Sequence, residues 1–86
     1  MMYHVYILKS SKGGSLYVGY TNDVVRRLRE HNAGLVDFTK SLKPWKLAYY
    51  ESFASLEDAR TREKGLKYFG KAYGQLKRRI KNSLNI

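Results

Sequence analysis

Cysteine is absent from this sequence, and proline and acidic residues are scarce, because the 86 residues include one proline and only seven Asp and Glu. Without cysteine, neither disulfides nor thiolate metal sites can add to the stability of the fold. A domain of this size buries roughly 60% of its unfolded surface. We therefore expect one domain spanning residues 1–86, with one modest core. The lack of cysteine suits a reducing cytoplasm, where we expect the protein to reside.

Long apolar runs are missing as well. No stretch approaches the roughly 20 apolar residues that a membrane-spanning helix needs, and the N-terminus has no signal-peptide pattern. The basic segments also lack a large apolar face opposite their charge, which argues against binding at a membrane surface. The sequence therefore predicts a soluble intracellular protein.

What the sequence has in excess is positive charge. Seventeen Lys and Arg give a formal net charge of +10, and nine of these bases fall between Arg60 and Lys81, where Glu63 is the only acid. Such a surface attracts polyanions, and nucleic acid is the most common polyanion in a cell. The alternative is a solvated basic face that only aids solubility. The candidate nucleic-acid contacts are Arg60, Arg62, Lys64, Lys67, Lys71, Lys77 and Arg78.

The first part of the chain predicts a β-hairpin followed by a helix. Tyr3–Lys9 is rich in aromatic and β-branched residues, which is typical of a strand, and Ser15–Tyr20 indicates the returning strand. Between them, Ser10–Gly14 contains paired glycines that can adopt positive φ in a turn. Gly34 is placed to end the helix, and its candidate N-caps are Thr21, Asn22 and Asp23.

The second part predicts a third strand and two more helices. Residues 36–44 indicate a loop, and Trp45–Phe53 indicates a strand. Ser55 and Asp58 form a capping box for a helix that runs to about Tyr68. Gly70 is expected to break this helix, and a final basic helix is expected at about residues 73–84. The order ββαβαα indicates an α+β domain, with a three-stranded antiparallel or mixed sheet flanked by helices.

Two polar residues of the first predicted helix lie near its apolar stripe. Val24 and Leu28 define that stripe. His31 projects within roughly 20° of Val24, and Arg27 within roughly 60°. A half-buried guanidinium needs a partner or a ligand, so Arg27 is either a ligand-binding residue or a structural ion pair, and His31 either functional or a hydrogen-bonded core residue. The neighbouring charged residues are expected to face solvent: Arg26, Arg29 and Glu30.

Glu63 is the corresponding anomaly on the second predicted helix. It falls inside the apolar stripe defined by Leu56, Ala59 and Leu66. A carboxylate in that position must be neutral, paired or metal-bound. Mg²⁺ prefers oxygen ligands and needs only one or two carboxylates besides waters and phosphate. Glu63 is therefore a candidate metal ligand, the alternative being an ion pair with Arg27 or another base.

Two tyrosines and a glycine fall on one face of the predicted hairpin. Side chains alternate along a strand, so Tyr6 lies opposite or diagonal to Tyr17 on the same face. Gly19 has no side chain beside them, which lets a ligand or another backbone approach. The alternative is an ordinary aromatic pair with a bulge glycine.

Together these residues resemble the GIY-YIG nuclease superfamily. The first motif corresponds to His4-Val5-Tyr6, with His4 in place of the glycine, and the second to Tyr17-Val18-Gly19. Arg27 follows eight residues after Gly19, His31 one helical turn later, and Glu63 on the second predicted helix. The resemblance covers nearly the whole chain. Because no DNA-reading domain is expected beside this one, the chain is similar to the small stand-alone bacterial members of the UPF0213 type.

The resemblance implies metal-dependent hydrolysis of phosphodiester bonds. Glu63 would hold Mg²⁺ or Mn²⁺, and Arg27 would donate hydrogen bonds to the phosphoryl oxygens. Tyr6 would act as general base, which requires its pKa to be lowered from about 10. Tyr17 would support Tyr6, and His31 would assist proton transfer or contact phosphate.

The implied substrate is nucleic acid, with DNA favoured over RNA and little intrinsic sequence specificity, because Lys and Arg contacts to the backbone carry no sequence information. Aromatic residues among the C-terminal bases either stack on unpaired bases or pack the last helix onto the body: Tyr68, Phe69 and Tyr73. Two other functions stay open: a nucleic-acid-binding module with little turnover, and a module that binds an acidic protein.

Overall fold

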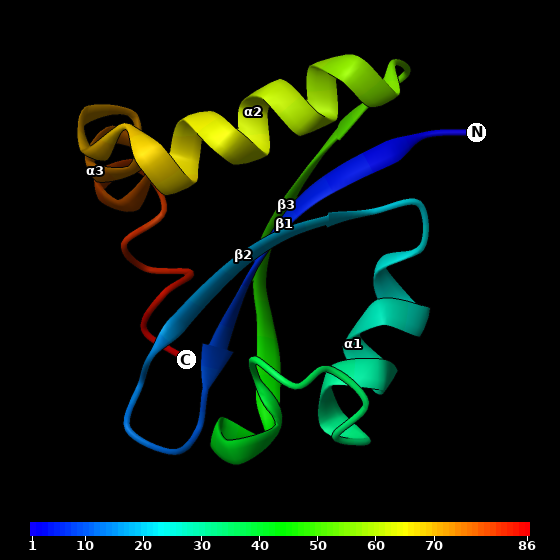
Figure 1. The fold of residues 1–86 in the computed structure, drawn as a ribbon. Coiled ribbons are helices and arrows are strands. Elements are labelled where there is room, and N and C mark those ends of the chain that lie inside the picture. Colours follow the sequence, from blue (N-terminus) through cyan, green and yellow to red (C-terminus); the bar gives the residue numbers. More distant parts are fainter.

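A computed structural model describes residues 1–86 as an α+β fold in the predicted order ββαβαα (Figure 1). The three strands form one antiparallel sheet in the order β2-β1-β3, so that β1 is central and β2 is an outer strand. The strands are β1 (Tyr3–Ser10), β2 (Leu16–Thr21) and β3 (Trp45–Phe53). The helices are α1 (Val24–Asn32), α2 (Leu56–Tyr68) and α3 (Gly70–Arg79), with a 3₁₀ turn at Lys40–Leu42.

The turn between β1 and β2 uses two glycines in the left-handed region. Gly13 and Gly14 have φ of +96° and +80°, a conformation that residues with a Cβ rarely adopt. The turn sets a register in which Tyr6 lies opposite Gly19 and Leu8 lies opposite Tyr17. Tyr6 and Tyr17 are therefore diagonal neighbours on one face, as the alternation of side chains predicts.

Helix α1 is fixed at both ends by polar side chains. Asp23 is its N-cap, because its carboxylate accepts a hydrogen bond from the Arg26 N–H at 3.0 Å. Near the other end, the Asn32 side chain accepts from the Trp45 N–H at 2.6 Å and donates to the Trp45 carbonyl at 3.1 Å. These bonds tie the end of α1 to the start of β3, and so orient the face of α1 that carries His31.

The two C-terminal helices meet at a sharp bend. Ser55 caps α2 as predicted, since its hydroxyl accepts a hydrogen bond from the Asp58 N–H. The expected break at Gly70 is wrong: the break falls at Phe69, whose extended backbone separates the helices, and α3 begins at Gly70 and ends at Arg79. The low helix propensity of glycine, about 1 kcal/mol per residue, is outweighed because α3 buries Leu76 against the sheet.

The end of the chain also differs from the prediction. The expected final helix continues to about residue 84, whereas residues 80–84 are in turns. Leu84 packs against the core, and its carbonyl accepts a hydrogen bond from Lys9 Nζ at 2.8 Å. These contacts hold the last residues against the sheet, in turns rather than in a continuing helix.

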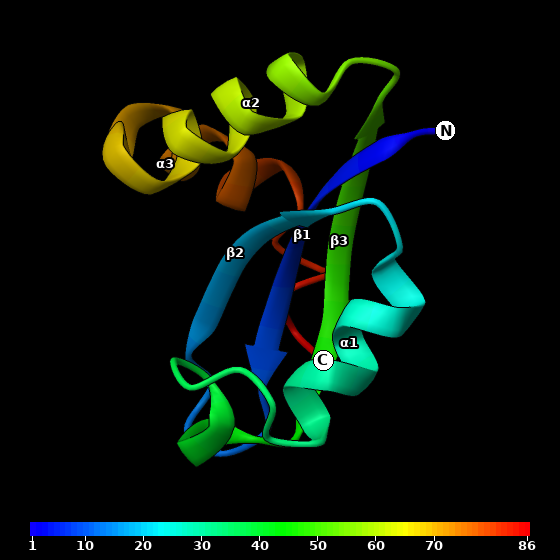
Figure 2. The ribbon, with the colours of Figure 1, turned by 45° about the vertical axis from the view of Figure 1, so that its right-hand side comes forward.

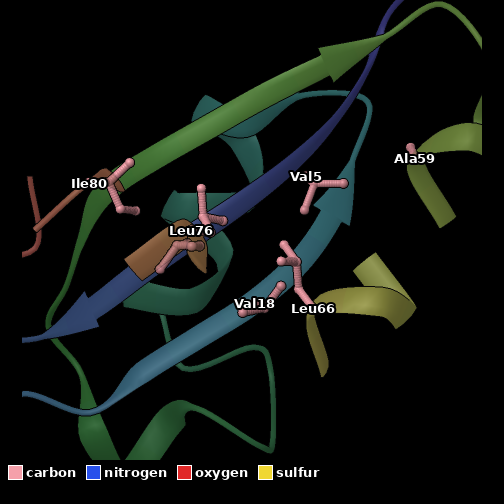
Figure 3. Close-up of a cluster of buried hydrophobic side chains, with 7 residues drawn as sticks. Val5, Val18, Ala59, Leu66, Leu76 and Ile80 are labelled. Atoms are coloured by element: carbon pink, nitrogen blue, oxygen red, sulfur yellow. The ribbon is translucent and has the colours of Figure 1, made fainter. Parts of the chain in front are cut away.

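The sheet separates two cores (Figure 2). On one face, α2 and α3 cover a wholly aliphatic cluster, most of which Figure 3 labels: Val5, Ile7, Val18, Ala59, Leu66, Leu76 and Ile80. On the other face, α1 and the loop after it cover a smaller cluster of Tyr6, Leu8 and Trp45. Successive residues of β1 thus belong to opposite cores, and β1 is buried on both sides.

No helix of the structure is both long enough and apolar enough to cross a membrane.

Candidate active site

A cavity of about 390 Å³ opens where β1, β2, α1 and α2 meet. It brings together five residues that the sequence predicts for the site: Tyr6, Tyr17, Gly19, Arg27 and Glu63. Tyr20, Thr21, Asn22, Arg26 and Glu30 complete its lining. Tyr6 and Tyr17 come from the sheet face covered by α1, and Arg27 comes from α1 itself, whereas Glu63 comes from the helix on the opposite face. The site therefore lies at the outer edge of β2, where the two faces meet.

Gly19 makes room for Tyr6. A Cβ built on Gly19 would lie 2.5 Å from the Tyr6 hydroxyl oxygen and 3.1 Å from a ring carbon of Tyr17. Real Cβ atoms do not approach other atoms so closely, so any side chain at this position would displace Tyr6. The expected close approach at Gly19 is therefore made by the ring of Tyr6 rather than by a ligand or another backbone.

A chain of hydrogen bonds runs from Tyr6 into the core. The Tyr6 hydroxyl lies 3.0 Å from His31 Nε2, and His31 Nδ1 lies 2.7 Å from Thr39 Oγ1. The single hydroxyl proton of Thr39 is donated to the Val36 carbonyl, at 3.4 Å. In the tautomer in which Thr39 Oγ1 accepts from His31 Nδ1–H, Nε2 is the acceptor of the Tyr6 proton. His31 is thus in hydrogen-bond contact at both ring nitrogens, and its side chain is fully buried.

The pKa values of this pair favour neutral groups. Burial of the Tyr6 ring raises its pKa to about 12, and the hydrogen bond and charge of Arg27 oppose this only in part. This is the opposite of the lowered pKa that the sequence interpretation requires of Tyr6. Burial also lowers the pKa of His31 below its ordinary value, and the charge of Arg27 acts in the same direction. At neutral pH the pair is therefore a tyrosine hydroxyl facing a neutral imidazole.

Tyr17 closes the aromatic side of the site. Its ring centroid lies 5.0 Å from that of His31 and 6.3 Å from those of Tyr6 and Trp45. The rings of His31 and Trp45 meet Tyr17 edge-to-face and that of Tyr6 is tilted, and aromatic pairs at such distances stabilise one another. Tyr17 is therefore a packing partner of the Tyr6–His31 pair, and no hydrogen bond joins the two tyrosine hydroxyls.

Arg27 lines the cavity while it forms an ion pair. Its Nη1 lies 2.9 Å from Glu30 Oε1, and Glu30 also lies 3.8 Å from Arg26 Nε. Arg26 is exposed, as predicted, although it also lines the cavity. Glu30 differs from the prediction, because it is half-buried and lines the cavity beside Arg27. Long charged side chains can reach back from positions outside the apolar stripe, so the helical angle alone does not place them. Arg29 is exposed, as predicted.

Glu63 lies inside the site but is engaged by a base. Its side chain is 12% exposed, and Oε2 lies 2.7 Å from Nζ of Lys67, one helical turn later. The same ammonium group lies 5.5 Å from the centroid of Tyr17. Burial alone would lower the pKa of Lys67, but the hydrogen bond and charge of Glu63 outweigh it and raise the pKa. The expected alternative of an ion pair is thus realised with Lys67, and not with Arg27.

The oxygen chemistry of the site fits a hard divalent cation. Glu63 supplies one carboxylate that faces the cavity. The structure contains no cluster of three or more His, Cys, Asp and Glu side chains with metal-binding geometry. A site built on one carboxylate corresponds to the way Mg²⁺ is usually held, with waters and substrate phosphate completing its shell. Such a cation would replace the ammonium of Lys67 as the partner of Glu63.

The other predicted nucleic-acid contacts are spread over α2 and α3. Arg62 forms a half-buried ion pair with Glu51 of β3, at 2.6 Å, and thus ties the helix to the sheet. Lys77 lies over the ring of Tyr73, 4.5 Å from its centroid. The remaining candidates are exposed: Arg60, Lys64, Lys71 and Arg78. On α2, Arg60, Lys64 and Lys67 lie within about 100° of Glu63 on one side, and Arg62 lies on the other.

Thr39 is a buried member of the site that the sequence analysis did not identify. It lies in the loop after α1, where neither periodicity nor capping gives a signal. Its hydroxyl contacts His31, and its carbonyl accepts a hydrogen bond from Trp45 Nε1 at 3.0 Å. Only the packing of the loop onto α1 and β3 brings these groups together.

Comparison with known proteins identifies the class of this domain. The model of the GIY-YIG catalytic domain matches residues 2–68, which include β1, β2, α1, β3 and α2. The chain therefore belongs to the GIY-YIG family, a family of nucleases, and the predicted resemblance is confirmed.

Within this family the similar proteins are small. A UPF0213 protein of Halobacterium salinarum is 43% identical over 72 residues, which cover 83% of this chain and 92% of that protein. A UPF0213 protein of Staphylococcus haemolyticus is 43% identical over 70 residues, covering 80% and 84%. The solution structure of a UPF0213 protein from Bacillus halodurans superposes with a TM-score of 0.55 at 36% identity, covering 88% of this chain and 82% of that one.

Proposed function

We propose that the protein is a divalent-metal-dependent endonuclease that hydrolyses phosphodiester bonds in nucleic acid, with DNA favoured over RNA and with low intrinsic sequence specificity. One observation carries the proposal. Tyr6, Arg27 and Glu63, from three separate elements, line one open cavity in a chain with a net charge of +10. Binding alone does not require a buried tyrosine hydroxyl and a carboxylate inside a basic site.

Arg27 would bind the phosphate to be cleaved. Its guanidinium already reaches the cavity, and Glu30 holds it there at 2.9 Å. A guanidinium offers paired donors to phosphoryl oxygens, and it stabilises the charge that builds up on them as water attacks. Glu30 is thus a positioning residue that limits the motion of Arg27.

Tyr6 and His31 would together remove the proton of the attacking water. A tyrosine with a pKa of about 12 is protonated at neutral pH and cannot accept a proton unless it first loses its own. The His31 Nε2 atom, 3.0 Å away, accepts that proton while Tyr6 takes the proton of the water. Thr39 keeps the second His31 nitrogen protonated, so that Nε2 stays available for this transfer.

Glu63 would hold Mg²⁺ or Mn²⁺ after releasing Lys67. When bound, the cation supplies polarisation of the phosphate and stabilisation of the leaving oxygen. Lys67 can move aside because its side chain is 34% exposed at the surface of α2. Freed from Glu63, its ammonium remains beside the site as a contact for phosphate.

The test is cleavage of labelled single-stranded, duplex, flapped and branched DNA, and matching RNA, with Mg²⁺ or Mn²⁺. Cleavage should require the metal and disappear in Glu63→Gln and in Tyr6→Phe. Glu57→Gln, at an exposed carboxylate of the same helix, and Tyr3→Phe, on the same strand, serve as matched controls and should retain cleavage. Cleavage that survives in Glu63→Gln would contradict the assignment of the metal site.

A nucleic-acid-binding module with little turnover is the second candidate. Two observations favour it: Glu63 is neutralised by Lys67 at 2.7 Å, and the pKa of Tyr6 is raised to about 12. This function predicts salt-sensitive binding without cleavage of any of these substrates. In that outcome Glu63→Gln should lower the stability of the protein and leave its affinity for nucleic acid unchanged.

A further inference from the structure

A second cavity continues from the candidate active site along the outer edge of β2. Its volume is about 490 Å³, and every residue that lines it except Lys67 is hydrophobic. Tyr17 lines both cavities. Tyr17 and Gly19 are two residues apart on a strand, which separates their Cα atoms by about 7 Å. On α2, the cavity is lined by Leu66 and Lys67, one turn after Glu63.

Aromatic side chains from four segments surround this cavity. Tyr17 belongs to β2, Phe38 to the loop after α1, Tyr68 to the end of α2 and Tyr73 to α3. Phe38 is 88% exposed and Tyr68 is 75% exposed, so neither contributes much to the core. Single exposed aromatics are common on protein surfaces, but here two of them border one apolar cavity beside a catalytic site. Their position points to a ligand with flat faces.

The charge around the cavity indicates what this ligand is. Lys67 lies between the two cavities, and its neighbours Lys64 and Lys71 are exposed and form no ion pair. A second copy of this chain would bring its own net charge of +10 against the same charge here, which disfavours self-association. Unpaired nucleotides combine aromatic faces with negative charge, and stacking of their bases on aromatic side chains is tolerant of sequence.

We propose that this second cavity binds an unpaired nucleobase of the strand whose phosphate lies at Arg27 and Glu63. This inference rests on the proposed nuclease function and names its substrate class. The bases of an intact duplex are stacked inside the helix and cannot enter such a cavity. The preferred substrate is therefore nucleic acid with a single-stranded segment next to the bond that is cleaved.

The first experiment measures binding without catalysis. Fluorescence anisotropy in EDTA would compare a labelled single-stranded oligonucleotide, the same strand in a duplex, and a strand with abasic positions. Phe38→Ala and Tyr68→Ala should each weaken single-strand binding by about 5- to 150-fold, which is the range for loss of one stacked base. Binding of the duplex and of the abasic strand should change little in either variant.

Phe69→Ala is the matched control. Phe69 follows Tyr68, is 67% exposed and does not line the cavity, so its loss should leave single-strand binding unchanged. Both target side chains are largely exposed, so their variants should fold, and circular dichroism would verify this. Equal weakening of single-strand and duplex binding, or no change in Phe38→Ala and Tyr68→Ala, would overturn the proposal. Dimerisation at high concentration that Phe38→Ala abolishes would assign the cavity to a second copy and would also overturn it.

A cleavage assay separates this inference from the proposed function. Glu63→Gln should abolish cleavage and still bind single strands with the preference of the native chain. A protein that never cleaves, but loses single-strand binding in Phe38→Ala, would contradict the nuclease proposal and support the cavity as a base-binding site. A protein that cleaves a flap and an intact duplex equally well would contradict the cavity proposal and leave the nuclease standing.

Discussion

The central strand β1 presents chemically different side chains to the two faces of the sheet. Toward α2 and α3, β1 presents Val5 and Ile7 to a cluster of aliphatic side chains. Toward α1, it presents Tyr6 and Leu8 to a cluster that includes Trp45, with His31 and Thr39 buried close by. Every buried polar side-chain atom is hydrogen-bonded. The aliphatic face therefore supplies stability, whereas the polar face uses its buried groups to hold the Tyr6 hydroxyl in place.

The largest effects should come from two variants, one on each face of the sheet, compared in their stability and in their cleavage of nucleic acid. Leu76→Ala deletes a side chain that is 2% exposed in the aliphatic cluster and lines neither cavity, and it should lower the free energy of unfolding by about 2–5 kcal/mol. Cleavage per folded molecule should stay within a few-fold of the native value. Tyr6→Phe should lower cleavage by about 10²–10⁴-fold, which is the range for a general base, at a smaller cost in stability. Thermal unfolding and single-turnover cleavage would check the pair, and equal effects on both quantities in both variants would contradict the division of roles.

Gly19→Ala should disturb the polar face alone. The added Cβ would clash with the Tyr6 hydroxyl at 2.5 Å, so Tyr6 must move away from His31. Overpacking of this kind costs about 1–3 kcal/mol of stability. Cleavage should fall toward that of Tyr6→Phe, and the double variant should be no worse than Tyr6→Phe. Gly65→Ala, where a Cβ meets open space, is the control.

His31 should make stability depend on pH on the acidic side. Burial lowers its pKa in the folded state below the ordinary 6.5. As pH falls below 6.5, the unfolded chain binds a proton that the folded chain resists, so stability falls until the folded pKa is passed. The slope for one proton is at most about 1.4 kcal/mol per pH unit. Urea unfolding from pH 7.5 to 5 should show a smaller decline in His31→Gln, and parallel curves would show that His31 does not resist protonation.

Lys67→Met should have the smallest effect. It tests Glu63, which reaches the site from the helix that covers the aliphatic face. The Glu63–Lys67 contact is partly exposed, and pairs of this kind contribute about 0.2–1 kcal/mol. Without Lys67, a divalent cation no longer competes with an ammonium group for Glu63. The affinity for Mn²⁺, measured by calorimetry without nucleic acid, should rise about 1.4- to 5-fold. Lys64→Met, with no ion pair to Glu63, should leave this affinity unchanged.

Local patterns in the sequence predicted most of this architecture. Alternation and turn chemistry gave the three strands, and Asp23 and Ser55 were among the predicted caps of α1 and α2. Gly70 misled the prediction of α3 because tertiary burial outweighs the weak helix propensity of glycine. Propensity describes a residue in isolation, and the start of α3 is decided by what the helix covers.

The site was less predictable than the fold, because its partners are distant in sequence. The clustering of Tyr6, Tyr17, Gly19, Arg27 and Glu63 follows the ordered motifs. The contact of His31 with Thr39, and that of Arg62 with Glu51, depend on how loops and helices pack, which no local spacing encodes. Arg62 shows the consequence. It was predicted to contact nucleic acid because it lies in a basic run of the sequence, but it is half-buried in an ion pair with Glu51.

The position of the site on the outer strand limits how copies of this chain can assemble. The outer edge of β2 carries backbone groups that no strand of this sheet pairs, and such edges are open to pairing with another chain. Both cavities lie along this edge, so a strand added there would cover Gly19 and Tyr17 and block entry of any substrate. Edge-to-edge pairing that retains access to the site must therefore use the outer edge of β3, whereas pairing through β2 would close the candidate site.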